Sequence, residues 1–585
     1  MRRQAPFLIC CLVLIFFSLI SFRLGRIMLG QGEELAAVAN AQQIRSLDYY
    51  QYARGDILDR KNRNITNVQE NCLLLHPAML EDRRAAQIFL ADVLDLPLEQ
   101  LSSRFPGEDT PGFCVFKTGI PAEQAREIQE AKLPGVSCLQ LAARYSSSQP
   151  ATQLIGSCRW EEGRWRGVSG LEAIYDSDLT GRQDKQIIAY VDADGQMSQE
   201  NFYLLEEEPQ YNRLELCLDL DYQQIAENAF RSAGHTGACV ILDPENGDLL
   251  AAASVPGYDP YFFQDLEKDA YVNKVFSLYP PASTFKCLLA AAALNEGLSL
   301  PGAADSQASH RLQQELASGR EEETESVPEP AEENIPGEEE GVFVCSGSYY
   351  FGDGRCVRCT SAANGHGPLD LGKALAVSCN CYFVALGQSM GGELIRKYCG
   401  KLGLCSQQLI AYPLAEDSPE DYLDFDDSVP ADLANVSLGE RGVMLSPLQE
   451  AVFYAALANG GRLPQARLLQ RISSSSGEVL REFPAEEPEQ VLDAEVAEQI
   501  REMLVQAVEK GTANALSQSS EGAGAKTGTS ESGGVWISGF VPAGEPQLVI
   551  VVHVDQGVAG GIEAAEIFHR IVQDIYALEG ELEQA

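Results

Sequence analysis

The chain has 585 residues, a length that corresponds to about three to five folding units of ordinary size. Its 43 Lys and Arg residues against 85 Asp and Glu residues give a net charge of −42. Such a field repels polyanions, which argues against nucleic acid as a partner. With 45% hydrophobic and 22% charged residues the chain can bury a sizeable core, so wholesale disorder is excluded as well.

The chain begins with an apolar run over residues 7–22, preceded by Arg2 and Arg3. This run of 16 residues is shorter than the roughly 20 that cross a bilayer comfortably, but flanking arginine side chains can reach the interface. We expect residues 1–30 to form a short cytoplasmic tail and a single transmembrane anchor. The alternative is a cleaved signal peptide, but the small-residue site Ala37-Val38-Ala39 lies well beyond the run.

The elements expected after the anchor follow from periodicity and turn residues. Residues 32–47 have an alanine-rich helical pattern and are predicted to form a stalk. The further expectations are a turn into a strand at 54–60, a helix at 121–131, a strand and helix over 214–232, a hairpin of strands 237–242 and 249–254, a buried strand at 547–555, and a closing helix at 563–578.

Two acidic stretches interrupt this pattern. Residues 320–341 hold ten glutamates and three prolines and cannot bury a core. We expect a disordered acidic insertion at about 318–342; a binding role for it is the alternative. The second stretch, 416–432, contains aromatic side chains such as Tyr422 and is expected to be an ordered surface loop.

Three short motifs follow the hairpin in a fixed order, and each is weak alone. Singly, their serine, lysine and asparagine would be a helix N-cap, a solvated charge and a turn residue, and the first pattern arises by chance about once or twice in a chain this long. The ordered trio is typical of serine β-lactamases and penicillin-binding proteins. The motifs are Ser283-Thr284-Phe285-Lys286, Ser378-Cys379-Asn380 and Lys526-Thr527-Gly528-Thr529.

The spacing of the first motif matches nucleophilic catalysis. A helix carries residues i and i+3 on one face, so Lys286 can reach the hydroxyl of Ser283. The lysine accepts that proton only when neutral, a state favoured by burial and by a second cation such as Lys526. Ser378 can relay the proton to a leaving amine, and Asn380 can hold a substrate amide.

The third motif offers groups for an anionic substrate. Lys526, Thr527 and Thr529 present a cation and two hydroxyls to a carboxylate, with Gly528 between the threonines. The backbone N–H groups of Ser283 and Thr529 are candidates for an oxyanion hole.

With these motifs the sequence resembles the class B penicillin-binding proteins, membrane-anchored D,D-transpeptidases that cross-link peptidoglycan. The resemblance covers nearly the whole chain. It includes Arg54-Gly55, Leu154-Ile155-Gly156, Gly167-Val168-Ser169-Gly170-Leu171-Glu172, Asp243-Pro244, His366-Gly367, Ser446-Pro447-Leu448-Gln449 and Asn459-Gly460-Gly461.

The resemblance implies an α+β protein. Behind the transmembrane helix it places an elongated pedestal or dimerisation domain over 31–212. The transpeptidase domain then spans 213–585, with a mainly antiparallel sheet flanked by helices and a helical subdomain. The catalytic domain is implied to be extracellular.

For the chemistry, the resemblance implies that Ser283 is acylated by a D-Ala-D-Ala stem peptide with Lys286 as the base. An amine of a neighbouring stem peptide then attacks, and β-lactams block the site. A membrane glycan polymerase and a second copy of the chain are implied partners, and no cofactor is implied. The alternatives are a β-lactam sensor or inactive scaffold, and a serine β-lactamase.

The chain departs from the family pattern at a few places. Ala282 and Ala525 stand where glycine is common before the serine and the lysine. Gly439-Glu440-Arg441-Gly442 replaces an expected Gly-Gln-Gly, and Gly533-Gly534-Val535-Trp536-Ile537 replaces an aromatic pair. These changes affect the expected substrate specificity more than the expected activity.

Five of the 16 cysteines gather near the second motif: Cys345, Cys356, Cys359, Cys379 and Cys381. The pair Cys356 and Cys359 has zinc-ligand spacing, but its partner pair is spaced by one and surrounds Asn380, so we expect no metal. A disulfide from Cys345 to Cys356 or Cys359 and a set of free buried thiols remain the two alternatives.

Overall fold

The computed structural model describes residues 5–30, 44–47, 54–107, 114–146, 148–161, 164–181, 185–191, 197–206, 211–261, 268–298, 343–351, 355–359, 364–414, 419–517, 522–557 and 561–584. The chain divides into two compact units. The first comprises Met1–Arg54, Asn67–Ser147 and Gly181–Tyr211, and the second comprises Gly55–Thr66, Ser148–Thr180 and Asn212–Ala585. The acidic insertion expected at 318–342 lies outside the described residues.

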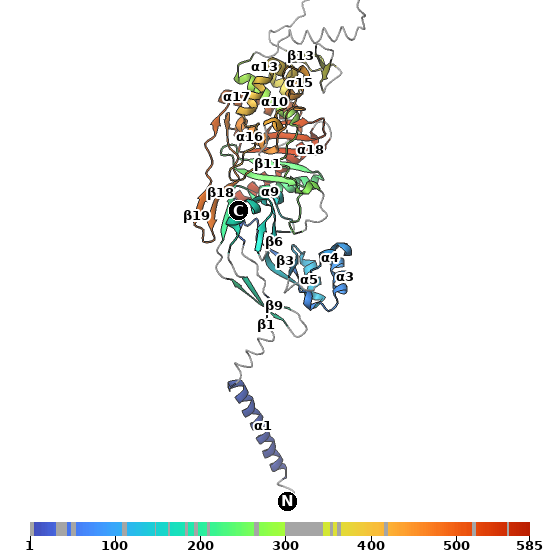
Figure 1. Cartoon of the computed structure of the whole chain (residues 1–585), viewed down its shortest axis with the longest axis vertical. Coiled ribbons are helices and arrows are strands. Elements are labelled where there is room, and N and C mark those ends of the chain that lie inside the picture. The colour runs from blue at the N-terminus through green and yellow to red at the C-terminus, as the bar shows by residue number, and fades with distance from the viewer. Residues whose placement is uncertain are drawn as a thin grey trace, which may run out of the picture. The chain divides into compact units, whose positions relative to one another are not determined.

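The first unit contains helix α1 (Ala5–Gly30), which includes the apolar run (Figure 1). Within the described residues, no helix combines the length and the apolar character needed to cross a membrane. The transmembrane anchor therefore stays a prediction. The predicted helical stalk is wrong at its end, because Ile44–Leu47 is strand β1 and pairs antiparallel with β8 (Lys185–Val191). Residues 32–43 of that stalk lie outside the described part of the chain.

A small α/β core completes the first unit. Strand β3 (Val68–Leu75) lies between β4 (Cys114–Lys117) and β5 (Val136–Ala143), both antiparallel to it. Leu73 and Leu75 face one cluster with Leu90 of α3. Strand β9 (Met197–Glu206) pairs with β8, and the helices are α3 (Arg83–Val93), α4 (Leu98–Arg104) and α5 (Ala122–Glu130), the last as predicted.

A five-stranded antiparallel sheet forms the centre of the second unit, in the order β12-β11-β23-β22-β21. The predicted hairpin is confirmed as β11 (Gly237–Leu242) and β12 (Leu249–Val255), and the predicted buried strand as β23 (Leu548–Val554). Strand β22 (Val535–Val541) pairs with β21 (Gly524–Thr529), which carries the lysine motif at the edge of the sheet. The third motif thus lies on a strand.

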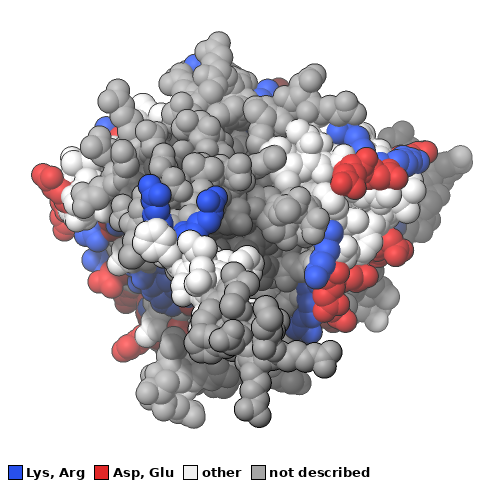
Figure 2. Space-filling model, turned by 90° about the horizontal axis from the view of Figure 1, so that it is seen from below, with Lys and Arg blue, Asp and Glu red and all other residues white. Residues whose placement is uncertain are grey.

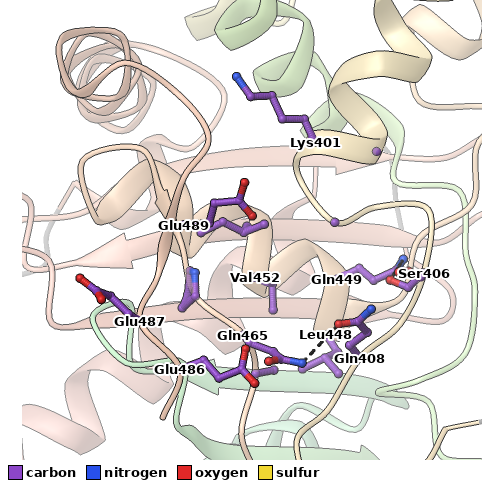
Figure 3. A pocket seen from close by; sticks show the side chains of 15 residues that line it. Lys401, Ser406, Gln408, Leu448, Gln449, Val452, Gln465, Glu486, Glu487 and Glu489 are labelled. Atoms are coloured by element: carbon purple, nitrogen blue, oxygen red, sulfur yellow. Dashed lines mark hydrogen bonds between the residues drawn. The ribbon is translucent and has the colours of Figure 1, made fainter.

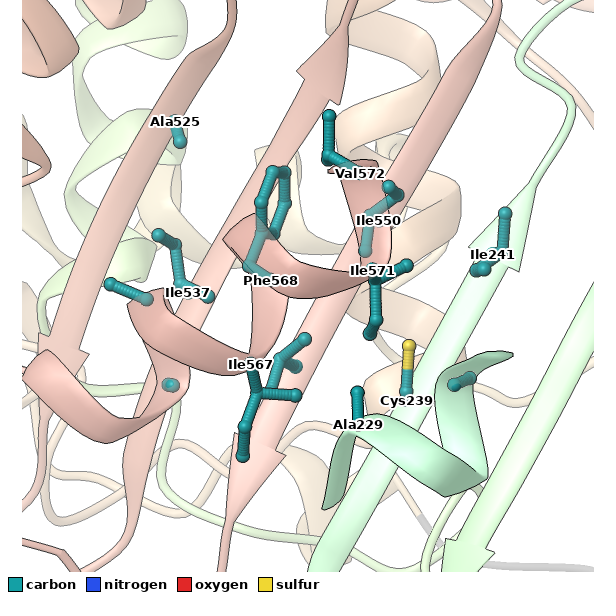
Figure 4. Close-up of a cluster of buried hydrophobic side chains, with 14 of the residues drawn as sticks. Ala229, Cys239, Ile241, Ala525, Ile537, Ile550, Ile567, Phe568, Ile571 and Val572 are labelled. Atoms are coloured by element: carbon teal, nitrogen blue, oxygen red, sulfur yellow. The ribbon is translucent and has the colours of Figure 1, made fainter. Parts of the chain in front are cut away.

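Helices cover both faces of this sheet, which explains why every residue of β22 and β23 is buried. On one face lie α9 (Leu220–Ala233) and the closing helix α18 (Ile562–Gln584). Figure 4 shows Phe568 and Ile571 of α18 over the strands that carry Ile537 and Ile550. Helix α16 (Pro447–Ala458) contacts β11 and β23 from the other side.

Further helices form a predominantly helical region around α10 (Lys286–Asn295), which carries the first lysine. The short helices α6 (Thr152–Ile155), α7 (Gly170–Ile174) and α8 (Asp176–Leu179) pack elsewhere in this unit. The helical region contains α12 (Leu371–Ala376), α13 (Asn380–Lys401), α14 (Pro419–Tyr422), α15 (Pro430–Ser437) and α17 (Ala494–Lys510). Two short antiparallel strand pairs also belong to this region. They are β13 (Phe343–Cys345) with β16 (Gly367–Leu369), and β14 (Ser348–Tyr350) with β15 (Cys356–Arg358).

A second sheet shows why residues 55–66 belong to this unit. Strand β10 (Asn212–Leu216) lies between β18 (Leu469–Ser474) and β2 (Ile57–Leu58), and β19 (Val479–Glu482) pairs with β18. Arg63 pairs with Asp59 and with Asp221 at the start of α9, each at 2.6 Å. These contacts cross the predicted boundary at 212, because they join residues 55–66 to residues that follow it.

Candidate active site

Ser283 lies in a 3-10 turn, Ala282–Phe285, that leads directly into α10. The residue before it, Ala282, has a φ of 53°, in the left-handed region that favours glycine. The alanine that replaces the common glycine therefore stands at a position of real backbone strain. The turn itself is held by Ala282 N–H, which donates to Gly439 O at 2.7 Å.

Lys286, one helical turn after the serine, is completely buried and joins the first motif to the second. Its Nζ donates to Asn380 Oδ1 at 2.7 Å, to Ser378 O at 3.0 Å and to Ser378 Oγ at 3.2 Å. The sequence placed Lys286 beside Ser283; the structure adds that the ammonium is shared with both polar residues of the second motif.

Ser378 stands at the junction of α12 and α13, with a φ of 56°. Its hydroxyl receives a second hydrogen bond from Lys526 Nζ at 3.0 Å, and that ammonium also donates to Thr527 O at 2.8 Å. One hydroxyl is therefore in contact with both lysines. All three motifs therefore meet at this oxygen.

Burial weakens the proton affinity of both lysines. It lowers the pKa of Lys286 to about 8, although nearby thiols and the carboxyl of Glu440 act in the opposite direction. Burial, followed by the positive charge of Lys286, lowers the pKa of Lys526 to about 7. Two buried cations so close together cannot both hold their protons easily, which makes a neutral amine accessible near neutral pH.

Strand β21 passes directly beside the serine turn. A Cβ on Gly528 would lie 3.0 Å from Pro281 O and 3.3 Å from Ser283 N, so glycine permits the close approach. Thr527 Oγ1 donates to Thr512 Oγ1 at 2.8 Å. The β21 backbone thus passes close to the N–H of Ser283, and the pairing of this group with the Thr529 N–H in an oxyanion hole stays a prediction.

The altered Gly-Glu-Arg-Gly segment lies against the same turn. Gly439 has a φ of 74°, and a Cβ there would be 1.9 Å from Ala282 O. Glu440 Oε2 accepts hydrogen bonds from Ser530 Oγ at 3.0 Å and from Glu531 N at 3.2 Å. This carboxyl joins the segment to the end of β21, and burial raises its pKa.

Several supporting residues were not identified from the sequence. Trp536 Nε1 donates to Pro280 O at 2.9 Å, just ahead of the serine turn. The ring of His553 lies 4.0 Å from that of Tyr279 and 4.4 Å from that of Trp536, and burial lowers the pKa of His553 to about 4. In the sequence Trp536 stands out only as a departure from the family's aromatic pair, because its ring partner His553 lies on another strand, β23.

A second group of supporting residues lies behind α10. Glu450 on α16 is completely buried, and Ser538 Oγ donates to its Oε1 at 3.2 Å. Burial raises the pKa of Glu450 to about 7. The sequence did not predict that Glu450 lies under the serine turn, because α16 has a mainly apolar pattern with no signal for this contact.

Of the five clustered cysteines, three are brought together with a histidine. Cys345, Cys359 and Cys379 are buried free thiols, and with His366 they place one ligand atom each within 4.8 Å of one another. Cys356 is exposed and free. The disulfide from Cys345 to Cys356 or Cys359 is therefore not formed in this structure.

A cavity of about 390 Å³ lies elsewhere in the second unit, between the end of α13 and α16 (Figure 3). Figure 3 shows Lys401, Gln449 and Glu489 on its walls. None of the residues predicted for the active site lines it.

On the face drawn in Figure 2 the described acidic and basic side chains lie interspersed, without one field of a single sign.

Comparison with known proteins places these features in a family. Residues 237–318 and 337–573 match the penicillin binding protein transpeptidase domain, and residues 50–210 match the penicillin-binding protein dimerisation domain. The chain is 26% identical to stage V sporulation protein D of Bacillus subtilis, over 96% of this chain and 83% of that protein. It is 27% identical to the peptidoglycan D,D-transpeptidase PbpA of Mycolicibacterium smegmatis, over 68% of this chain and 78% of that protein.

A solved structure has a similar fold. The D,D-transpeptidase domain of a peptidoglycan glycosyltransferase from Eggerthella lenta superposes with a TM-score of 0.57 at 20% identity, covering 91% of this chain and 99% of that chain. The transpeptidase model spans all three motifs and the dimerisation model spans most of the first unit. With both domains matched in this order, the chain belongs to the class B penicillin-binding proteins, as its sequence motifs predicted.

Proposed function

We propose that Ser283 is the nucleophile with which this chain acts as a peptidoglycan D,D-transpeptidase. Its Oγ attacks the carbonyl carbon between the two terminal D-alanines of a stem peptide while Lys286 Nζ, in its neutral form, accepts the hydroxyl proton. The tetrahedral intermediate then expels the terminal D-alanine. Its amine takes the proton from Lys286 through Ser378, leaving an ester on Ser283.

The second half-reaction reverses these roles. An amine of a neighbouring stem peptide attacks the ester carbonyl and gives up a proton through the same groups, and the Ser283 hydroxyl is restored. Asn380 orients the amide of the donor peptide. In the first half-reaction Lys526, Thr527 and Thr529 hold the terminal carboxylate, which leaves with the D-alanine. The N–H groups of Ser283 and Thr529 stabilise the oxyanion in both half-reactions.

One observation supports these assignments above the others: the Ser378 hydroxyl accepts hydrogen bonds from both Lys286 and Lys526. A proton relay between the attacking and leaving groups needs such a shared oxygen. The relatives named as transpeptidases do not favour the alternatives of a β-lactam sensor, an inactive scaffold or a β-lactamase.

We also propose the setting in which the reaction occurs. Residues 1–30 anchor the chain in the cell membrane, with the catalytic unit outside the cell. The match of residues 50–210 to a dimerisation domain supports a homodimer, and a membrane glycan polymerase would supply the strands to be linked.

Labelling with a fluorescent penicillin tests the nucleophile. The full chain should form a covalent adduct that is lost in Ser283→Ala and kept in Ser277→Ala, a half-buried serine ahead of the turn. An adduct on Ser283→Ala would remove Ser283 from its role. Rapid hydrolytic release of the adduct would instead identify a β-lactamase, whereas a stable adduct without cross-linking of stem peptides would identify a sensor.

A further inference from the structure

A cluster of thiols and one imidazole lies directly beside the second motif. Cys345, Cys359 and Cys379 are 1, 2 and 0% exposed, and the imidazole of His366 faces them. The Nδ1 of His366 is 3.2 Å from Cys359 Sγ, and its buried Nε2 has no hydrogen-bond partner among the described residues. The ligand atoms of these three thiols and of the imidazole all lie within 4.8 Å of one another, and this gathering requires an explanation.

The distances correspond to ligands around a single ion. Cys359 Sγ and Cys379 Sγ are 3.7 Å apart, far more than the roughly 2.05 Å of a disulfide. Two sulfurs bound to one tetrahedral Zn²⁺ at about 2.3 Å each are separated by about 3.8 Å. A sulfur and a nitrogen on the same ion are separated by about 3.5 Å, against 3.2 Å here between Cys359 and His366.

The local fold brings these four residues together from separate segments. Cys345 ends β13 and is paired in register with Gly367 of β16, which places His366 beside it. Cys359 follows β15, and its N–H donates to Gly347 O at 2.8 Å. Cys379 is the N-cap of α13, where its Sγ accepts from Tyr382 N at 3.5 Å. A metal here would join three short segments that have little core of their own.

We propose that Cys345, Cys359, His366 and Cys379 form a structural zinc site. Three thiolates and one imidazole complete a closed tetrahedral shell, a common ligand set of structural zinc. The thiols release their protons when the ion binds. The spacing that counted against zinc in the sequence concerned the pair Cys379 and Cys381. Only Cys379 of that pair is among the four residues whose ligand atoms lie within 4.8 Å of one another, and a histidine completes the set.

The site also positions the second motif, an extension that rests on the proposed function. Cys379 lies between Ser378 and Asn380 in the chain, and Asn380 Nδ2 donates to Arg358 O at 3.2 Å, next to the ligand Cys359. An ion bound by Cys359 and Cys379 therefore holds the segment that Lys286 contacts in two ways. It binds Cys379 directly, and through Cys359 it fixes the neighbouring carbonyl that accepts from Asn380. Loss of the ion should loosen Asn380 without removing any group that touches substrate.

Metal analysis of the purified full chain tests the site independently of catalysis. We expect about one zinc per chain by mass spectrometry of the metal, and at least a tenfold lower content in Cys359→Ser and in Cys379→Ser. Cys356→Ser, in the same segment but exposed, is the matched control and should keep its zinc. Cobalt substitution should give the intense visible absorption of tetrahedral thiolate coordination.

The opposite results are equally clear. Alkylation of Cys345, Cys359 and Cys379 without stoichiometric zinc in the native chain, a Cys359–Cys379 disulfide in peptide mapping, or iron in place of zinc would overturn the assignment. Removal of zinc by a chelator should slow acylation by labelled penicillin at least fivefold, with recovery on re-addition of zinc. If zinc is bound but its removal leaves acylation unchanged, the positioning role is wrong and the metal site stands.

Discussion

The two perturbed lysines predict a bell-shaped pH dependence for acylation. Lys286 must lose its proton, so the rate rises with pH through its pKa of about 8. Lys526 must keep its proton to hold the substrate carboxylate, so the rate falls with pH through its pKa of about 7. Because the required form has the proton on the more acidic group, only a minor fraction of the enzyme is reactive at any pH.

The size of the effect follows from these two values. Treated as independent, each lysine is in its required form in about a quarter of the molecules at pH 7.5, which gives about 6% reactive enzyme. This fraction is a lower bound, because loss of the Lys286 proton removes one cause of the low pKa of Lys526. At pH 6 and at pH 9 that fraction is about 1%, which lowers the rate about sixfold on either side. The other groups acting on Lys286 are thiols and Glu440, and Cys287 acts on Lys526.

The variant Lys526→Arg isolates one limb of the profile. Its guanidinium stays protonated throughout, so acylation by a fluorescent penicillin should rise about tenfold from pH 7 to pH 9 and then level off. Lys373→Arg on α12, an exposed lysine, should keep the bell. A decline above pH 8 that persists in Lys526→Arg, or a flat wild-type profile from pH 6 to pH 9, would refute the reasoning. Melting curves of Lys526→Arg serve as the control for whether the fold tolerates a buried arginine.

Three further substitutions test the packing around the serine turn. Gly528→Ala should slow acylation about 10- to 100-fold, because the added methyl pushes β21 away from the serine turn. The control Gly544→Ala has open space around it and should change the acylation rate less than twofold. Equal rates in the two variants would contradict the close approach of β21 to the turn. Gly439→Ala should lower the free energy of unfolding in urea by about 1–3 kcal/mol, and an unchanged midpoint would contradict the strain at that position. Trp536→Phe should cost about 0.5–1.5 kcal/mol by removing the hydrogen bond to Pro280, and a neutral result would show that the bond contributes nothing.

The elements predicted correctly are those whose signals are local. The hairpin of β11 and β12 was predicted because its turn residues fix the register between two apolar runs. Ile44–Leu47 was predicted as helix but is a strand, since its pairing with β8 depends on residues more than a hundred positions away. The inclusion of residues 55–66 in the second unit likewise depends on pairing with β10.

The same distinction applies to the site. The motifs predicted which residues would meet, because residue type and order carry that information. They did not predict that Lys286 and Lys526 share one hydroxyl, which depends on the positive φ of Ser378. The cysteine cluster was recognised, but His366 was not placed in it, because the histidine reaches the thiols through the pairing of β13 with β16, a contact with no signature in the spacing of cysteines.

The hydrogen bond of Trp536 gives the protein an internal optical probe. The chain has three tryptophans, and this one is buried with its indole N–H tied to the backbone just ahead of the nucleophile. Its ring also lies against His553, which burial keeps uncharged and therefore a weak quencher at neutral pH. A shift of the serine turn during acylation would change the emission of Trp536, so binding of an unlabelled antibiotic can be followed in real time without a chromophore on the drug.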